Sequence, residues 1–347
     1  MSTICKQNSY SVYSIPCSDY CIYIYSISPF TTYQIGGNYK TEIKQHLIIY
    51  SSYISLCIFV RLIDFCTAAN VSLTSDVELM MVSEELFNMS SHELFNHVYI
   101  NYQGNMSFKN FTDNAPQRLL NISTKIFLIP TIRSLVKLFD NYELDTYEPE
   151  VITREEDLEE NEFIDNLMET DIISHVMYFL SVKGFFKNDI RVYKDILKQI
   201  WFHLYSRSKN INGTSGFEHV FIGERKPRKG IIGLHNWIFF SHGELLKKIN
   251  YFGFGHSQEF VNKAVILEIY FTYIGKRKRS SMFIGTTPEL EIALYTLCFF
   301  TRPNKRCQLS FGGFKFYVQT YILQNNGTKF IGTAFPMFSY IKHKSNK

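Results

Sequence analysis

The spacing of the apolar residues changes near Gly216, and this change limits what the chain can fold into. Before it, apolar residues recur at intervals of three and four, as on one face of a helix. This pattern covers Ile190, Tyr193, Ile196, Leu197, Ile200, Trp201 and Leu204, and a shorter one covers Ile132, Leu135, Val136, Leu138 and Phe139 after Pro130. After Gly216 the apolar residues alternate, as in half-buried strands. The sequence therefore predicts an α+β fold in which a helical lobe precedes a sheet-rich lobe.

The second lobe is defined by its alternating segments and the turns between them. The alternation covers Val265, Leu267, Ile269, Phe271 and Tyr273, and again Phe314, Phe316 and Val318. Asn325-Asn326-Gly327 predicts a turn that leads into a further strand over residues 329–335. A helix is expected over residues 288–300, because Pro288 would stand in its first turn and acidic residues near its N-terminus.

The length and composition are those of a folded protein. The chain has 347 residues, of which 46% are hydrophobic, and this is enough apolar surface for one large domain or two packed lobes. The net charge of +4 is too small to indicate a nucleic-acid partner by itself. Acidic residues gather in 155–162, and basic residues gather in 225–229, 247–248 and 276–279. The basic groups indicate either an anionic partner or ordinary solvated surfaces.

The first 69 residues differ from the rest of the chain. Residues 1–46 are rich in Tyr and Ser and have no periodic apolar face, so no fold is assigned to them. Residues 47–69 begin with an apolar run from Leu47 to Val60, which Arg61 closes and small residues follow. This plan is typical of a signal peptide or, if it is not cleaved, of a signal anchor that would hold the protein at a membrane. A spanning helix usually needs about 20 apolar residues, and this run is shorter.

Acceptor motifs for N-linked glycans recur after the apolar run. Asn-x-Ser/Thr occurs at Asn70, Asn88, Asn105, Asn110, Asn121, Asn212 and Asn326. Five of the seven cysteines lie in or before residues 47–69, which leaves Cys298 and Cys307 as either a disulfide or two free thiols. Together these features predict a secreted glycoprotein, with single-pass membrane anchoring as the alternative.

Two histidines stand in dense local patterns, sixteen positions apart (235 − 219). His219 lies within Ser215-Gly216-Phe217-Glu218-His219-Val220-Phe221-Ile222-Gly223-Glu224, and His235 lies within Gly233-Leu234-His235-Asn236-Trp237. Imidazole, with an ordinary pKa of about 6.5, can give or take a proton near neutral pH. The glycines indicate turns that would bring both rings to one cleft. The histidines are therefore candidates for an acid–base pair, although a single histidine in such a domain is more often a packed or surface residue.

These segments resemble the EndoU family of uridylate-selective endoribonucleases. Further blocks agree in the same order: Trp201 to Arg207 upstream, then Phe283 to Glu291, Ala293 to Cys298, Arg302-Pro303, Cys307 to Ser310 and Gly312-Gly313. Several separate blocks in one order are far more specific than a single short motif. The resemblance spans residues 84–340 and implies two subdomains that face each other across a catalytic cleft. It also implies cleavage of single-stranded RNA at uridines by attack of the 2′-hydroxyl, which gives a 2′,3′-cyclic phosphate.

The resemblance implies roles for individual residues. His235 would be the base, His219 the acid, and Lys278 the cation beside the phosphate. Lys276 is the alternative to Lys278, because the segment before Phe283 is one residue shorter than in most members. Two acidic residues, Glu218 and Glu224, would orient His219, form surface salt bridges, or hold a divalent cation such as the Mn²⁺ or Ca²⁺ that assists some members. The sequence argument itself requires no metal.

Recognition of uracil is expected from Ser281, Thr333 and Phe335. The hydroxyl of Ser281 would read the edge of the base, and Thr333-Ala334-Phe335 matches a Thr-Ala-Tyr of the family. The ring of Phe335 can still stack, but the hydroxyl of the family tyrosine is missing. We therefore expect a weaker preference for uridine.

Two other functions fit parts of the sequence. A secreted RNA-binding protein of the EndoU type, with little or no turnover, would account for Phe335 and the shortened segment, but not for the intact histidines and lysine. The other is an extracellular adhesion or hydrolytic protein of another kind. The sequence has no Gly-x-Ser-x-Gly motif of a serine hydrolase. No protein partner can be inferred.

Overall fold

The structure is a computed structural model that describes residues 10–17, 20–27, 74–91, 93–106, 112–208, 211–325 and 327–339. Contacts divide the chain into two units, Met1–Ala69 and Asn70–Lys347. In the first unit, strands β1 (Tyr10–Cys17) and β2 (Tyr20–Ile27) pair antiparallel, in a region to which the sequence assigned no fold. The expected signal peptide or anchor, residues 47–69, lies outside the described residues. No helix of the described part is long and apolar enough to span a bilayer.

Helices fill the first half of the second unit. They are α2 (Asp76–Met89), α3 (Pro130–Lys137), α4 (Arg154–Met168), α5 (Asp171–Val182) and α6 (Ile190–Phe202), with short 3₁₀ turns η1 (Phe95–His97), η2 (Thr124–Leu128) and η3 (Leu138–Asp140) and a small β3–β4 pair (Val98–Ile100 and Leu120–Ile122). The helical periods predicted after Pro130 and over residues 190–204 are confirmed. In α6 the buried face carries Leu197, Ile200 and Trp201, as an amphipathic helix requires.

The acidic stretch noted in the sequence forms helix α4. Thr153 caps it, because the Thr153 side chain accepts a bond from the backbone of Glu156 while the Glu156 side chain accepts one from the backbone of Thr153. Acidic side chains in the first turn also suit the positive end of the helix dipole. The stretch is therefore more than a solvated charge run, because the same helix buries Phe163 and Ile164 against the core.

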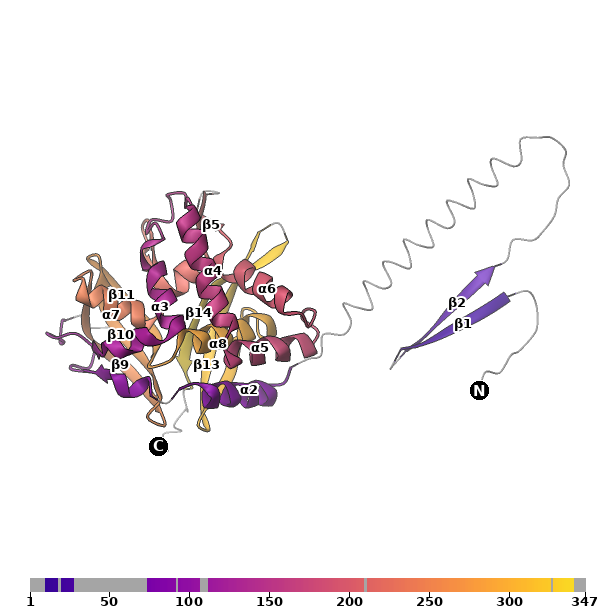
Figure 1. The fold of residues 1–347 in the computed structure, drawn as a ribbon, viewed down its shortest axis with the longest axis horizontal. Helices are drawn as coiled ribbons and strands as arrows, with labels where there is room; N and C mark the ends of the chain where they lie inside the picture. The colour runs from indigo at the N-terminus through magenta and orange to yellow at the C-terminus, as the bar shows by residue number, and fades with distance from the viewer. Residues whose placement is uncertain are drawn as a thin grey trace, which may run out of the picture. The chain divides into compact units, whose positions relative to one another are not determined.

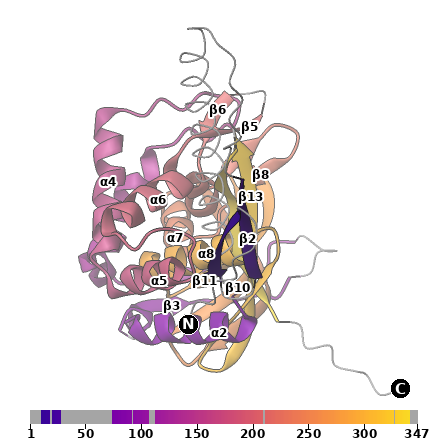
Figure 2. The same ribbon diagram turned by 90° about the vertical axis from the view of Figure 1, so that its right-hand side faces the viewer.

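Antiparallel strands fill the second half. One three-stranded sheet has the order β11-β10-β9, and another has the order β12-β13-β14. Their bounds are β9 Ile249–Phe260, β10 Ala264–Tyr273, β11 Lys276–Ile284, β12 Arg306–Phe311, β13 Phe314–Asn325 and β14 Thr328–Phe338; two hairpins precede them, β5–β6 (Tyr205–Ser208 and Ile211–Thr214) and β7–β8 (Glu224–Lys226 and Gly230–Ile232). Figure 2 shows α4, α5 and α6 on one side and β8, β10, β11 and β13 on the other, with α7 (Trp237–Leu245) and α8 (Pro288–Thr301) between them. The predicted α+β class is confirmed.

Helix α8 is the buried centre of the second unit (Figure 1). Every residue from Pro288 to Phe299 is buried, and a helix that is enclosed on all sides shows little amphipathic period. Trp201 of α6 donates a 3.0 Å bond to the hydroxyl of Thr296, and the ring of Phe283 from β11 stacks on Tyr295. The helix therefore contacts both the helical lobe and the sheets that carry the candidate site.

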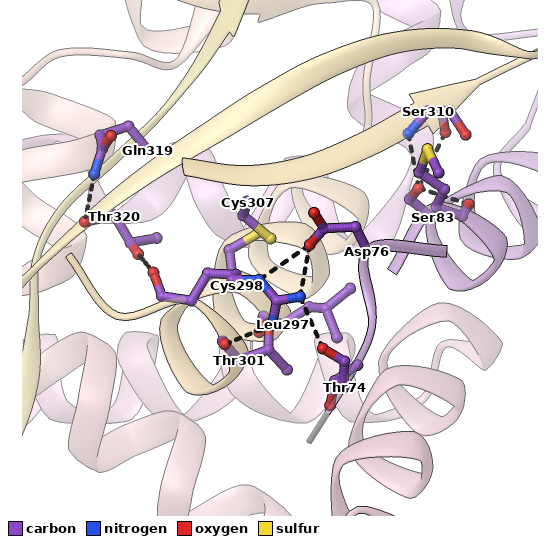
Figure 3. Close-up of a disulfide and its surroundings, with 12 residues drawn as sticks. Thr74, Asp76, Ser83, Leu297, Cys298, Thr301, Cys307, Ser310, Gln319 and Thr320 are labelled. Carbon is purple, nitrogen blue, oxygen red and sulfur yellow. Dashed lines mark hydrogen bonds and ion pairs between the residues drawn. A yellow bond between two sulfur atoms is a disulfide. The ribbon is translucent and has the colours of Figure 1, made fainter. Parts of the chain in front are cut away.

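A disulfide joins the last turn of α8 to β12. Cys298 and Cys307 are fully buried, and their Cα atoms are 5.6 Å apart. Figure 3 shows this bond beside Thr74 and Asp76, at the start of the second unit. Arg302, in the loop that the disulfide closes, bonds to Asp76 at 2.6 Å and to the carbonyl of Thr74 at 2.7 Å. Of the two alternatives left by the sequence, the structure contains the disulfide; closing so short a loop stabilises the fold by about 2.5 kcal/mol.

Candidate active site

The two histidine segments are held together by backbone hydrogen bonds. His219 lies in a single π-helical turn, Glu218–Ile222, and the N–H groups of Leu234 and His235 donate to the carbonyls of His219 and Val220 at 2.9 and 2.7 Å. Gly233 makes this approach feasible, because a Cβ there would lie 1.9 Å from the carbonyl oxygen of His219. Its φ of +71° is also one that residues with a side chain rarely adopt. The two rings are thus fixed relative to each other by the main chain.

His235 has a defined tautomer. Its Nδ1 lies 2.9 Å from the carbonyl oxygen of Ser281 and 2.9 Å from the hydroxyl of Ser280, which itself donates to the carbonyl of Leu234. A carbonyl oxygen can only accept, so Nδ1 carries the proton and Nε2 carries a lone pair. Burial, followed by the charge of Lys278, lowers the pKa of His235 well below its usual value. The ring is therefore neutral near pH 7 and able to accept a proton at Nε2.

His219 has a carboxylate partner instead. Its Nδ1 is 2.7 Å from Oε2 of Glu224, and the same carboxylate accepts a bond from Nε of Arg207. Burial lowers the pKa of His219 well below its usual value, and the charges of Arg207 and Lys278 lower it further. Burial also raises the pKa of Glu224 to about 7. In the free protein both shifts disfavour the charged forms of this pair, and the 2.7 Å bond fixes the orientation of the His219 ring.

Lys278 reaches the histidines and Lys276 does not. Lys278 lies on β11 opposite Phe271 of β10, and its side chain lines a cavity of about 580 Å³ together with His219 and His235. Burial lowers the pKa of Lys278 to about 8. Lys276 is exposed at the beginning of the strand and lines neither cavity of the site. Of the two candidate lysines, the structure therefore places Lys278 beside both imidazoles.

The three residues expected to recognise uracil lie in the walls of two adjoining cavities. Ser281 lines a smaller cavity of about 260 Å³, Thr333 lines the larger one, and Phe335 and His235 line both. The ring of Phe335 stacks on His235, with centroids 4.9 Å apart. Ser281 donates its hydroxyl proton to the carbonyl of Pro336 at 2.6 Å. The hydroxyl oxygen of Ser281 thus keeps its lone pairs for a donor on the substrate.

Glu218 occupies a different position from Glu224. It is buried, and neither of its carboxyl oxygens has a hydrogen-bond partner among the described residues. Burial raises the pKa of Glu218 well above its usual value, and the nearby carboxyls of Glu224 and Glu150 raise it further. Consecutive residues of a helical turn point in different directions, so Glu218 faces the interior when His219 faces the cavity. Of these two acidic residues, only Glu224 contacts His219.

Two supporting residues were not predicted. In the sequence, Arg207 is only the last residue of the block from Trp201 to Arg207, yet it bonds to Glu224, to the hydroxyl of Tyr205 at 2.7 Å and to the carbonyl of Gly332. Ser280 bonds to His235. These partners come from distant parts of the chain, and no local motif marks them. Their function is to hold the two rings in place.

A second support reaches His235 from α8. Asn236 caps α7 by accepting bonds from the backbone of Ile238 and Phe239, and its amide donates to Glu291 at 3.4 Å. The indole of Trp237 donates to the carbonyl of Thr286 at 2.9 Å. Burial raises the pKa of Glu291 to about 8. The turn that carries His235 is therefore bound to the first turn of the central helix.

Comparison with known proteins agrees with this geometry. Residues 78–336 match the sequence model of the family described as Endoribonuclease XendoU. The chain belongs to the XendoU family. This confirms the resemblance to EndoU proteins, and the matched segment contains both histidines and Lys278.

Individual members of the XendoU family are similar over most of the second unit. A uridylate-specific endoribonuclease of Bos taurus is 35% identical over 76% of this chain, and uridylate-specific endoribonuclease B of Danio rerio is 35% identical over 65% of it. The match covers 65% of the bovine protein and 81% of the zebrafish one, so the chain spans just under two thirds of the bovine relative. A solved structure, titled as XendoU, a splicing independent snoRNA processing endoribonuclease, matches with a TM-score of 0.64 and 29% identity; the match covers 78% of this chain and 99% of that one.

The acidic residues of this XendoU-family site do not fit the Mn²⁺ or Ca²⁺ ion considered from the sequence. Within the described ranges, no group of three or more His, Cys, Asp or Glu side chains is placed to hold a metal ion. Glu224 is already bonded to His219 and Arg207, and Glu218 favours its neutral form. Divalent cations need several anionic or carbonyl oxygens together.

Proposed function

We propose that the chain is an endoribonuclease that cleaves single-stranded RNA after uridines and leaves a 2′,3′-cyclic phosphate. The observation that carries this proposal is that His219, His235 and Lys278 line one cavity. Relatives that bear the name uridylate-specific endoribonuclease support the same reading. An acid, a base and a fixed cation around one site are what transfer of a phosphoryl group to the adjacent 2′-oxygen requires.

His235 acts as the base in this proposal. Its Nε2 takes the proton of the ribose 2′-hydroxyl, because Nδ1–H is held by the carbonyl of Ser281. The 2′-oxygen then attacks phosphorus, the bond between phosphorus and the 5′-oxygen breaks, and His219 protonates that leaving oxygen. The anionic phosphate raises the pKa of both imidazoles when it binds, since a nearby negative charge favours the charged form. Glu224 stabilises the protonated state of His219 at 2.7 Å.

Lys278 stabilises the charge that develops during the attack. Negative charge accumulates on the phosphate oxygens that take no part in bond making or breaking. A cation already fixed beside those oxygens stabilises the transition state more than the ground state. Because Lys278 lies partly buried in the same cavity wall, little water competes for the interaction.

The assay for this function uses the full chain and a labelled oligonucleotide with one uridine. Cleavage at that uridine with a cyclic-phosphate end is the expected result. Binding without cleavage would instead select the RNA-binding alternative, and neither binding nor cleavage would contradict both. The assay is repeated with Mn²⁺, with Ca²⁺ and with a chelator, so that activation by an ion bound elsewhere appears as a difference in rate.

Selectivity for uracil is expected to depend on Ser281 and Phe335. Since Ser281 gives its proton to Pro336, its oxygen can accept the N3–H of uracil, whereas N3 of cytosine has no hydrogen to give. Phe335 adds no hydroxyl of its own. Phe335→Tyr is therefore expected to raise the ratio of kcat/KM for uridine over cytidine about fivefold, the effect of one added hydrogen bond. Competition between matched oligonucleotides measures this ratio; an unchanged ratio together with high wild-type selectivity would contradict the expectation.

We also propose that the protein follows the secretory route and carries N-linked glycans. The four acceptor asparagines that the structure describes, Asn88, Asn105, Asn121 and Asn212, are all exposed, and the disulfide is of a kind that persists in oxidising compartments. Protein expressed in secretory cells is expected in the medium and should lose mass on enzymatic removal of N-glycans. Recovery only in the membrane fraction after alkaline extraction would replace secretion with anchoring through residues 47–69. Unglycosylated protein in the cytosol would contradict the proposal.

A further inference from the structure

The larger cavity extends beyond the groups that the proposed reaction uses. The smaller cavity holds Ser281, and the larger one holds His219 and Lys278; His235 and Phe335 form the wall that the two share. Away from that wall, the larger cavity continues along β13 to Tyr321 and along the β7–β8 hairpin to Lys226 and Lys229. A single uridine with its phosphate does not account for this extension.

Tyr321 places an aromatic ring beside the catalytic groups. It lies on β13 directly opposite Thr333 of β14, and Gln319 lies opposite Phe335. Because side chains two residues apart share a face of a strand, Tyr321, Thr333 and Phe335 lie on the same face of this sheet. Tyr321 is 49% exposed, although it lines the cavity. An exposed ring beside a phosphate site is the platform on which proteins stack an unpaired base.

Lys226 and Lys229 supply positive charge in the same extension. Within the described part of the chain, neither lysine forms an ion pair with a carboxylate, and Lys226 donates to the carbonyl of Arg207 at 2.8 Å. Arg225 of the same hairpin differs, because it is paired with Asp145 at 2.6 Å. The charge of Lys226 also acts on the buried Glu224, whereas Lys229 is exposed at the turn of the hairpin. Two lysines that line a cavity without a carboxylate at ion-pair distance match the charge of a phosphodiester backbone.

The direction of the RNA chain in the site follows from the positions of two residues, the one that recognises the uracil base and the one that acts as the acid. The uracil reader, Ser281, lies in the smaller cavity only, and the acid, His219, lies in the larger cavity only. The leaving 5′-oxygen belongs to the nucleotide on the 3′ side of the broken bond, so that nucleotide must extend from His219 into the larger cavity. We propose that Tyr321 stacks on the base of this 3′ nucleotide and that Lys226 and Lys229 contact the next phosphate, on the 3′ side of that nucleotide. The proposal rests on the endoribonuclease function proposed above.

Abasic substitution tests the stack on the full chain. One oligonucleotide has a single uridine followed by adenosine, a second has an abasic ribose in place of that adenosine, and a third has the abasic ribose on the 5′ side of the uridine. We expect kcat/KM of the wild type to fall about tenfold for the second oligonucleotide, within the range given by the loss of a base–aromatic stack. For the third, the change should stay below about twofold, since that nucleotide does not reach Tyr321.

Variants of Tyr321 separate the contribution of its ring from that of the rest of the site. Tyr321→Ala should lower kcat/KM about tenfold on the adenosine substrate and cause no further loss on the abasic one, because the same stack is already absent. Tyr321→Phe keeps the ring and should keep the tenfold difference between the adenosine and abasic substrates. Tyr178→Ala, which removes an exposed tyrosine of α5 that lines neither cavity, is the matched control.

The contribution of the lysines is tested through the salt dependence of kcat/KM. Lys229→Gln should reduce the steepness of log(kcat/KM) against log salt concentration by about 0.7, the value for one lost contact with a single strand. Lys247→Gln, at an exposed lysine outside both cavities, should leave the slope unchanged. An unchanged slope for Lys229→Gln would remove Lys229 from the proposal.

The possible failures are distinguishable. If Tyr321→Ala slows cleavage of the adenosine and abasic substrates equally, or if the 5′ abasic site is the one that matters, the proposed 3′ subsite is wrong while the endoribonuclease function stands. If the wild type cleaves none of the oligonucleotides, the endoribonuclease function itself is wrong, and the subsite with it.

Discussion

Replacing His235 by alanine should lower kcat/KM for a uridine-containing oligonucleotide about 10³-fold, and His219→Ala should cause a loss of the same order. Each change removes one proton transfer and leaves Lys278 in place. Because the two histidines act in one step, the double variant should be little worse than the poorer single variant. Rates at substrate concentrations far below KM measure the effect.

The histidine result needs a control for folding. His175→Ala removes a half-buried histidine of α5 that lines neither cavity and pairs with Glu85 at 2.8 Å, and it should keep activity within about twofold, as substitutions away from the site usually do. Circular dichroism and thermal unfolding should show that all the variants are folded, since the His235 ring also stacks on Phe335. More than a tenth of wild-type activity in folded His235→Ala would mean that another group is the base.

Lys278→Gln is expected to lower kcat about 10²- to 10³-fold, the usual cost of removing a group that stabilises an oxyanion. Lys276→Gln is the matched control, because Lys276 lies on the same strand, is exposed and lines neither cavity; it should keep activity within about twofold. Equal losses in the two variants, or a larger loss for Lys276→Gln, would assign the role to the other lysine.

The same lysine predicts a pH dependence. Lys278 has a pKa of about 8 and is charged below it, so kcat/KM of the wild type should fall as pH rises through about 8. Lys278→Arg stays charged throughout that range, and the fall should disappear whatever its absolute rate. In addition, the charge of Lys278 lowers the pKa of both histidines. Lys278→Gln should therefore move the histidine limbs of the profile to higher pH, and unmoved limbs would show that the lysine does not face the rings.

Most of the fold could be predicted from periodicity because its elements are half-buried. A face of apolar residues at intervals of three and four indicated α6, alternation indicated β10 and β13, and the turn at residues 325–327 indicated β14. The acidic helix α4 was not predicted, since its charges concealed the few residues that it buries. For α8 the periodic signal is weak, because the helix is buried on all sides; only Pro288 and the acidic first turn indicated it.

The part of the site whose residues lie close together in the sequence could be predicted. The glycines around His219 and His235 correctly indicated turns that bring the rings to one cavity. The division between Glu218 and Glu224 was not predictable, since both stand close to His219 in the sequence and only the π-helical turn separates them. Arg207 was missed for a different reason. Its carbonyl partner, on Gly332, is 125 residues away, and no short pattern encodes such a contact.

The central helix has a consequence for how the protein tolerates change. Its first turn holds the loop of His235 through Glu291, and its last turn is joined by Cys298 to the sheet that contains Phe335. Deleting one residue inside α8 would rotate everything beyond the deletion by about 100° and carry Cys298 away from Cys307. Substitutions on the outer faces of α4 and α5 impose no such rotation. The number of residues in α8 is thus far more constrained than the residue types on the surface of the helical lobe.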